Sequence, residues 1–180
     1  SCPTRRSSDL GLYYHVITWG DPSLVTPERP PLFMVHGWMD VGASFQFVVD
    51  ALAALEGDTR YVLAADWRGF GQTRVPTTDS YWFADYLGDL DALIDHLSPE
   101  QPIDLVGHSM GGNIVMTYAG VRPERIRRLV NLEGFGMPQT RPEDAPKRLR
   151  QWLDELKQPQ LLRDYDSLQA VAERLMTTNP

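Results

Sequence analysis

The sequence predicts an α/β protein in which a mostly parallel sheet is covered by helices on both faces. Two observations support this fold class. Short segments rich in Val, Ile, Leu and aromatic residues alternate along the chain with longer segments of helical periodicity. The strand-like segments are also apolar throughout, which is typical of parallel strands buried on both faces. Right-handed crossovers are the default connection in such a sheet.

Five segments have the composition of buried strands. They comprise residues 12–20, 32–37, 60–67, 103–109 and 126–134. After the second strand, an amphipathic helix is expected to be capped by Ser44 and to end at Gly57. A second helix is expected to be capped by Ser80 and to stop before Pro99. Its apolar stripe is formed by Phe83, Leu87, Leu90, Ile94 and Leu97. A third helix follows the fourth strand and runs to about Gly120.

The character of the chain changes after this α/β core, which we place at residues 11–138. A Pro-rich loop leads to two amphipathic helices, over 147–157 and 167–176, with no strand between them. Two helices in succession interrupt the alternation of strands and helices. Residues 139–180 are therefore expected to begin a helical cap, or lid, inserted into the core.

The composition argues against several classes of function. A net charge of -7 disfavours nucleic-acid partners, because these favour a basic face. Cys2 is the only cysteine and the histidines lack metal-ligand spacing, so we expect no disulfide, no metal and no cofactor. No apolar run approaches a membrane span, and a cytoplasmic location is the expectation. Residues 1–10 are polar and aperiodic, and we interpret them as a non-native N-terminal scar.

Residues 105–115, LVGHSMGGNIV, contain the pattern Gly-x-Ser-x-Gly between a predicted strand and a predicted helix. In this context the serine occupies a sharp turn that exposes its hydroxyl, and Ser109 is the candidate nucleophile. The backbone N–H of Met110 is placed to bind an oxyanion. A second donor is expected in the loop after the second strand, where Gly37 lets the N–H of Trp38 face the pocket.

Three motifs, in this order, resemble those of the α/β-hydrolase superfamily and in particular its serine-hydrolase-like and esterase branches. They are HGW at 36–38, DWRGFGQT at 66–73 and GHSMGG at 107–112. The resemblance covers about residues 12–180 and implies an α/β-hydrolase fold that is truncated inside its cap. It also implies Ser109 as the nucleophile, the N–H groups of Trp38 and Met110 as oxyanion donors, and Asp66 as a structural carboxylate.

The base and the acid that would complete the triad are not evident. The four histidines are His15, His36, His96 and His108. None follows Ser109, whereas the base follows the serine in this family. His36 has two interpretations, a base or an organiser of its loop, and chain order favours the second. Glu133 also has two, a triad acid or a strand-end carboxylate that orders the loop. The resemblance implies that the histidine and the usual acid lie beyond Pro180.

These features predict a serine hydrolase that cleaves a carboxylic ester or related acyl bond of a small molecule through an acyl-enzyme. A serine nucleophile argues against dehalogenase or epoxide hydrolase chemistry, which needs an alkyl ester on a carboxylate. The alternatives are a C–C bond hydrolase or cofactor-free perhydrolase with the same triad, and a non-catalytic receptor or regulatory binder. The 180 residues alone are expected to be inactive, because the base is absent. The oligomeric state is not predicted.

Overall fold

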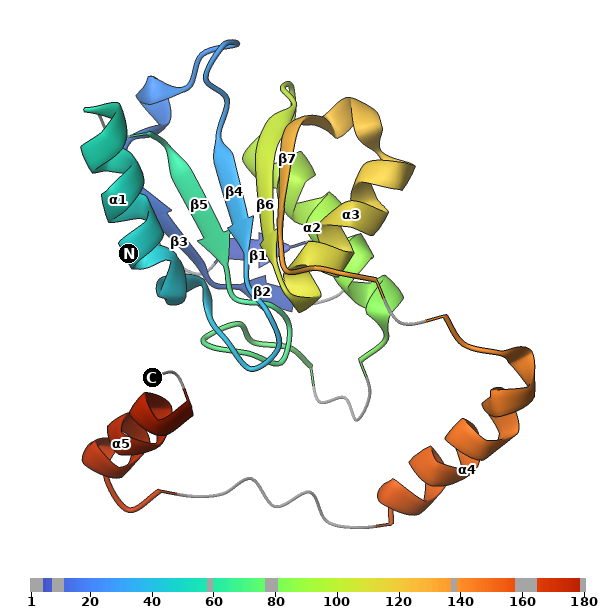
Figure 1. Ribbon diagram of the computed structural model, residues 1–180. Helices are drawn as coiled ribbons and strands as arrows, with labels where there is room; N and C mark the ends of the chain where they lie inside the picture. Colours follow the sequence, from blue (N-terminus) through green and yellow to red (C-terminus); the bar gives the residue numbers. More distant parts are fainter. Residues whose placement is uncertain are drawn as a thin grey trace. The chain divides into compact units, whose positions relative to one another are not determined.

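The computed structural model describes residues 5–7, 12–57, 60–76, 81–136, 139–157 and 165–178. The chain falls into two compact units, Ser1–Gly136 and Met137–Pro180. The first unit contains a five-stranded sheet (Figure 1). In spatial order its strands are β3 (Val16–Trp19), β5 (Val62–Ala65), β4 (Leu32–Val35), β6 (Ile103–His108) and β7 (Ile126–Leu132). Neighbouring strands are parallel except for β3, which is antiparallel to β5, so the predicted α/β fold with a mostly parallel sheet is confirmed.

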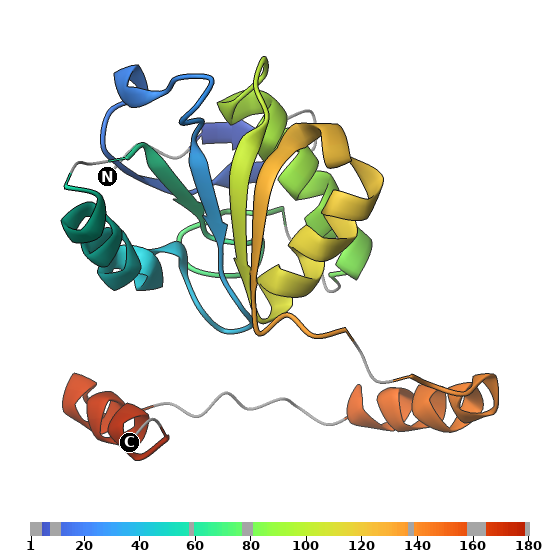
Figure 2. The same cartoon turned by 45° about the horizontal axis from the view of Figure 1, so that its top comes forward.

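Helices cover both faces of this sheet, as Figure 2 shows. On one face α1 (Gln46–Glu56) packs through Val49 against Met34 and its neighbours. On the other face α2 (Phe83–Leu97) and α3 (Met110–Val121) pack against Phe33 and the residues beside it. Successive strand residues point to opposite faces, so the same strands supply both clusters. This explains why the strand segments are apolar throughout.

The segment 12–20 forms two strands and not the single strand that we expected. β2 (Leu12–Tyr14) pairs with β1 (Arg5–Ser7) in a separate antiparallel sheet, whereas β3 joins the main sheet. The break falls at His15, whose backbone N–H donates to the hydroxyl of Thr73 at 3.0 Å. β1 lies within residues 1–10, and its polar composition gave no strand signal.

The start of α1 also differs from the prediction. A 3-10 turn, η2 (Gly42–Phe45), precedes the helix, and Ser44 lies inside this turn. Its hydroxyl donates to the carbonyl of Val41 at 2.8 Å and does not cap α1, so this prediction was wrong. The predicted end is confirmed, because Gly57 adopts a φ of 67° and its N–H bonds to the carbonyl of Ala53. Ser80 lies outside the described residues.

The buried face of α2 is rotated relative to the predicted stripe. Leu90 and Ile94 are buried as expected, but Tyr86 and Leu93 join them and Phe83 is 44% exposed. The same face buries a carboxylate. Asp89 is 3% exposed and accepts hydrogen bonds from the hydroxyl of Tyr14 and the guanidinium of Arg68. The burial of Asp89 depends on these partners from other parts of the chain, so the buried face of α2 includes Asp89.

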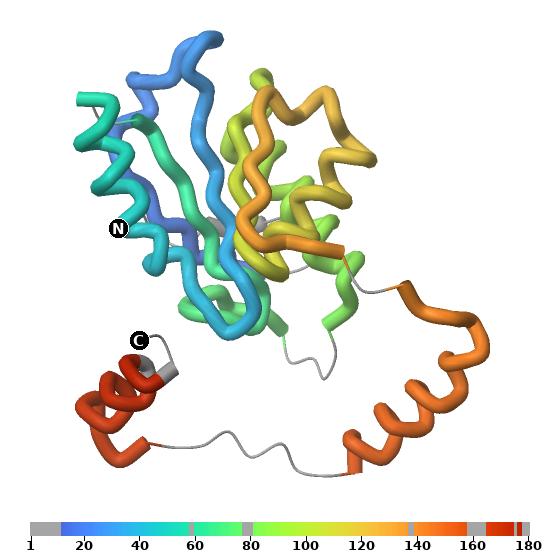
Figure 3. The backbone as a smooth tube through the Cα atoms, in the orientation of Figure 1, coloured from blue at the N-terminus to red at the C-terminus, as the bar shows by residue number. Residues whose placement is uncertain are grey.

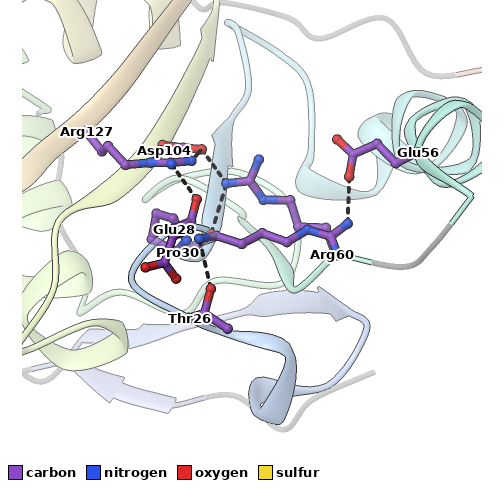
Figure 4. A network of polar contacts seen from close by, with 8 residues as sticks. Thr26, Glu28, Pro30, Glu56, Arg60, Asp104 and Arg127 are labelled. Atoms are coloured by element: carbon purple, nitrogen blue, oxygen red, sulfur yellow. Dashed lines mark hydrogen bonds and ion pairs between the residues drawn. The ribbon is translucent and has the colours of Figure 1, made fainter.

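A polar network links β6 to β7 on the face that carries α1 (Figure 4). Asp104 is 4% exposed, and its carboxylate accepts hydrogen bonds from Arg60 and, at 2.8 and 2.6 Å, from Arg127. The same arginines also donate to the carbonyls of Pro30 and Glu28. Burial by itself raises the pKa of Asp104, but the hydrogen bonds from Arg127 and Arg60 outweigh it and hold this pKa below 3.8.

β7 lies at one edge of the sheet and is more exposed than the other parallel strands. Its Val130 and Leu132 are 47% and 41% exposed, whereas Val35 on β4 is fully buried. We expected a core strand here, but within the described part of the chain β6 is the only strand beside it.

The second unit contains helices α4 (Ala145–Glu155) and α5 (Leu168–Thr178). Both predicted helices are therefore present, and no strand occurs among the described residues of this unit.

Candidate active site

The three motifs meet at one edge of the sheet. β4, β5 and β6 are parallel, so their carboxyl ends lie together (Figure 3). His36, Asp66 and Ser109 each follow directly on one of these ends. This is the position at which open α/β sheets bind ligands.

Ser109 has a strained backbone. It lies between β6 and α3 with φ 52° and ψ −114°, a region that residues with a Cβ rarely adopt. Its carbonyl accepts the first hydrogen bond of α3, from the N–H of Asn113 at 3.1 Å. The serine thus occupies the N-terminal end of a helix, where the helix dipole favours negative charge.

Two glycines allow this turn to sit close to its neighbours. A Cβ on Gly107 would lie 2.5 Å from the carbonyl oxygen of Gly111. A Cβ on Gly111 would lie 2.5 Å from the carbonyl oxygen of Val35 on β4. Both positions therefore require glycine for close approach of the backbone, as the motif predicts.

The loop after β4 lies against the serine. A Cβ on Gly37 would stand 3.0 Å from the Cβ of Ser109, so a larger residue would push the two apart. The predicted oxyanion donors are the next residues in each segment, Trp38 after Gly37 and Met110 after Ser109. The structure brings these two segments together, and the role of the two N–H groups stays a prediction.

His36 is fully buried, and both of its ring nitrogens are engaged. Nδ1 lies 2.7 Å from the carbonyl oxygen of Gly37, and Nε2 accepts the backbone N–H of Trp67 at 2.9 Å. Burial lowers the pKa of His36, because the charged ring would lose its hydration. Neither nitrogen is available to take a proton from Ser109, and the geometry agrees with a loop organiser.

The other histidines have different surroundings. His15 pairs with the buried carboxylate of Asp66 at 2.8 Å, and His96 is exposed in the last turn of α2. His108 precedes Ser109, and its Nε2 lies 3.9 Å from the carboxylate of Glu133. In the parts of the chain that the structure describes, no hydrogen bond joins a histidine ring to the side chain of Ser109.

Glu133 follows β7 with a φ of 58°, and its side chain is 76% exposed. Its carboxylate lies 3.9 Å from Nε2 of His108, and a long contact between two exposed groups contributes little stability. The structure thus brings Glu133 beside the residue that precedes the nucleophile. Both interpretations of Glu133 stay predictions.

Asp66 is buried and links three segments of the chain. Its carboxylate accepts the N–H groups of Gly42 and Gln72 at 2.7 and 2.8 Å, in addition to the ring of His15. With its oxygens used in this way, Asp66 is a structural carboxylate, as the resemblance implies.

Two residues that shape the site were missed from the sequence. Trp67 is fully buried and donates twice to His36, from its backbone N–H to the ring and from Nε1 to the carbonyl at 3.0 Å. The side-chain amide of Asn131 on β7 makes two hydrogen bonds with Gly134. Its NH2 group donates to the carbonyl of Gly134, and its oxygen accepts from the N–H of Gly134. In the sequence, the position of Trp67 directly after a strand-end aspartate is a weak indication of a role at the site. Asn131 has no such indication.

Among the described residues, no three His, Cys, Asp or Glu side chains are grouped so that they could hold a metal ion. None of the helices in these residues has the length and apolar character that crossing a bilayer requires.

The chain is similar to known proteins both in sequence and in structure. Residues 30–171 match the family model described as alpha/beta hydrolase fold. A cis-3-alkyl-4-alkyloxetan-2-one decarboxylase of Shewanella oneidensis is 36% identical over 119 residues, which cover 64% of this chain and 36% of that protein. A serine hydrolase-like protein of Danio rerio is 28% identical over 162 residues, 83% of this chain and 46% of that protein. The solved thioesterase domain from the curacin biosynthetic pathway is 30% identical with a TM-score of 0.77, covering 94% of this chain and 57% of that one.

The chain spans less than half the length of these two curated relatives. The family match nevertheless extends over most of the 180 residues, from β4 into the second unit. It agrees with the order of the parallel strands and with the strained serine after β6. The chain belongs to the α/β-hydrolase family.

Proposed function

We propose that the complete protein is a serine hydrolase that cleaves a carboxylic ester or related acyl bond of a small molecule, with Ser109 as nucleophile. The observation that carries this proposal is the backbone of Ser109, at φ 52° and ψ −114° between β6 and α3. Such strain costs of order 1–3 kcal/mol and is typical of functional sites. A turn of this kind presents the serine hydroxyl clear of the sheet.

In the proposed mechanism, Oγ of Ser109 attacks the carbonyl carbon while its proton passes to a histidine. The carbonyl oxygen becomes an oxyanion that accepts hydrogen bonds from the N–H groups of Trp38 and Met110. A donor of this kind contributes about 3 kcal/mol in comparable sites. The intermediate then expels the alkoxide, which takes the proton from the histidine and departs as the alcohol, and an acyl group remains on Ser109. Water attacks this acyl group with the help of the same histidine, which releases the acid.

The base is proposed to come from a histidine outside the 180 residues. Within them, His15 and His36 are held in buried hydrogen bonds, and His108 lies towards Glu133. The matched relatives contain more than twice the length that aligns here, which leaves room for a base and an acid. Glu133 is the alternative acid. Residues 139–180 are proposed to begin a helical cap that shapes the substrate pocket.

The test uses the full-length protein with p-nitrophenyl acetate. Hydrolysis is expected to be abolished by Ser109→Ala and unchanged by Ser44→Ala, a matched substitution in the exposed turn before α1. Mass spectrometry should find the acetyl group on Ser109. The 180 residues alone should show little turnover. Hydrolysis that survives Ser109→Ala, or brisk hydrolysis by the 180 residues alone, would contradict the proposal.

A substrate panel separates the alternatives. A C–C bond hydrolase would cleave a diketone faster than a simple ester. A perhydrolase would use peroxide in preference to water as the acyl acceptor. The name of the Shewanella relative specifies an oxetan-2-one, which is a cyclic ester, so this class belongs in the panel. A non-catalytic binder would be acylated once at most, without further turnover.

A further inference from the structure

The hydrogen bonds of His36 define one tautomer of its ring. Nδ1 lies 2.7 Å from the carbonyl oxygen of Gly37, and because a carbonyl only accepts, Nδ1 carries the proton. Nε2 lies 2.9 Å from the backbone N–H of Trp67, which only donates, so Nε2 carries none. The indole of Trp67 also holds the carbonyl of His36 at 3.0 Å. Ring and backbone are thus fixed together.

The carbonyl of Gly37 and the N–H of Trp38 belong to one planar trans peptide. These two groups point in opposite directions, so a contact that fixes the carbonyl also fixes the N–H. Residue 37 has to be small, because its Cβ would stand 3.0 Å from that of Ser109. Glycine satisfies this need but leaves the backbone conformationally free. The ring of His36 supplies the constraint that glycine lacks.

We propose that His36 is a positioning residue that orients the oxyanion donor, the N–H of Trp38, through the carbonyl of Gly37. Trp67 sets the tautomer that this task requires. The inference rests on the proposed function, because the N–H of Trp38 matters only if an oxyanion forms beside it. If the peptide turned over, it would present a carbonyl oxygen to the developing negative charge.

Two substitutions in the full-length protein separate the two ring nitrogens. In His36→Asn the amide NH2 replaces Nδ1 and still donates to Gly37, but nothing accepts from Trp67. In His36→Gln the amide oxygen replaces Nε2 and accepts from Trp67, but nothing donates to Gly37. His36→Leu removes both contacts.

With p-nitrophenyl acetate, kcat is expected to fall about 100-fold or more in His36→Gln and His36→Leu, the loss typical of one oxyanion donor. KM should change little. His36→Asn should keep kcat within about tenfold of wild type. This variant is nevertheless expected to melt at a lower temperature than His36→Gln, because it leaves the buried N–H of Trp67 without an acceptor. If kcat instead follows the melting temperatures of the three variants, His36 acts on stability alone and the proposal is wrong.

A measurement on the unmodified protein keeps the test independent of variant folding. NMR of 15N-labelled histidine should show His36 as the neutral Nδ1–H tautomer at neutral pH. An Nε2–H tautomer or an imidazolium would overturn the proposal. Failure of the proposed function is distinguishable, because it would appear in the wild type as ester hydrolysis that is absent or independent of Ser109.

Discussion

Gly37 and Ser109 face each other across the loops that follow β4 and β6, so closely that a Cβ on Gly37 would stand 3.0 Å from the Cβ of Ser109. The same Cβ would stand 3.2 Å from Nδ1 of His108. The proposed oxyanion loop and the nucleophile therefore meet without an intervening side chain. Their spacing depends on the absence of one methyl group.

Adding that methyl group should impair catalysis more than folding. Gly37→Ala is expected to lower kcat for p-nitrophenyl acetate by about tenfold. The new Cβ requires Ser109 or the loop to shift by a few tenths of an ångström, and a displacement of about 1 Å at reacting groups costs about 100-fold. Steady-state kinetics and thermal unfolding check it.

The matched control is Gly88→Ala, in the middle of α2. Apart from its chain neighbours and the backbone of α2 itself, no atom lies within 4 Å of a Cβ at this position. The variant should keep full activity and gain about 1 kcal/mol of stability from helix propensity. Equal kcat values for Gly37→Ala and wild type would contradict the prediction, because they would show that the loop accommodates the methyl group without loss of catalysis.

Removing the buried carboxylate of Asp104 should destabilise the protein. Asp104→Asn leaves Arg60 and Arg127 without their shared anion (Figure 4). Breaking a buried ion pair costs about 3–5 kcal/mol, and partial exposure of the arginines reduces this to about 2–3 kcal/mol. Urea unfolding measures the loss. Asp95→Asn, a control on the 65% exposed partner of Arg125, should change stability by less than about 0.5 kcal/mol.

The difference in stability between wild type and Asp104→Asn should depend on pH, because the pKa of Asp104 is lowered in the folded protein. The unfolded chain takes up the proton near 3.8, before the folded protein does. The stabilisation is therefore complete well above 3.8 and is lost as the pH falls through the pKa of the folded state. A gap between wild type and Asp104→Asn that stays constant down to pH 2 would contradict this assignment.

Much of the site was predictable because its parts are local in sequence. Ser109 and the glycines on either side lie within five consecutive residues, and their backbone requirements follow from the strand–turn–helix context. The contacts of His36 and Asp66 were not predictable in detail. Trp67 is 31 residues from His36, and His15 is 51 residues from Asp66. Hydrophobic periodicity carries no information about such pairs.

The fold shows the same division. The strands β4, β5 and β6 were predicted because apolar runs identify buried strands whatever their partners are. The buried face of α2 was misplaced because the burial of Asp89 depends on Tyr14 and Arg68, which come from other parts of the chain. A carboxylate without visible partners is expected to be exposed.

The neutral state of His36 gives a second pH prediction. Burial lowers the pKa of His36 below 6.5, and His108 adds to the lowering. The hydrogen bond to the carbonyl of Gly37 and the carboxylates of Asp40 and Asp66 act in the opposite direction but do not outweigh burial. Below pH 6.5 the unfolded chain binds a proton that the folded protein does not, so stability is lost as the pH falls. The slope is at most about 1.4 kcal/mol per pH unit. In His36→Gln this contribution should disappear. An unchanged slope between pH 7 and 5 would show that His36 takes up its proton equally in the folded and unfolded states, which would contradict a lowered pKa.

The strain at Ser109 predicts that activity and stability oppose each other at this position. Glycine adopts φ 52° and ψ −114° without a Cβ to strain, so Ser109→Gly should relieve a cost of order 1–3 kcal/mol. Glycine also adds about 0.5–1 kcal/mol of entropy cost on folding, which leaves a net gain of about 1 kcal/mol. Ser109→Ala keeps the Cβ and its strain and is the matched control, equally inactive but no more stable than wild type. Urea unfolding of the three proteins decides the matter, because equal stability of the glycine and alanine variants would mean that the serine turn stores no strain in solution.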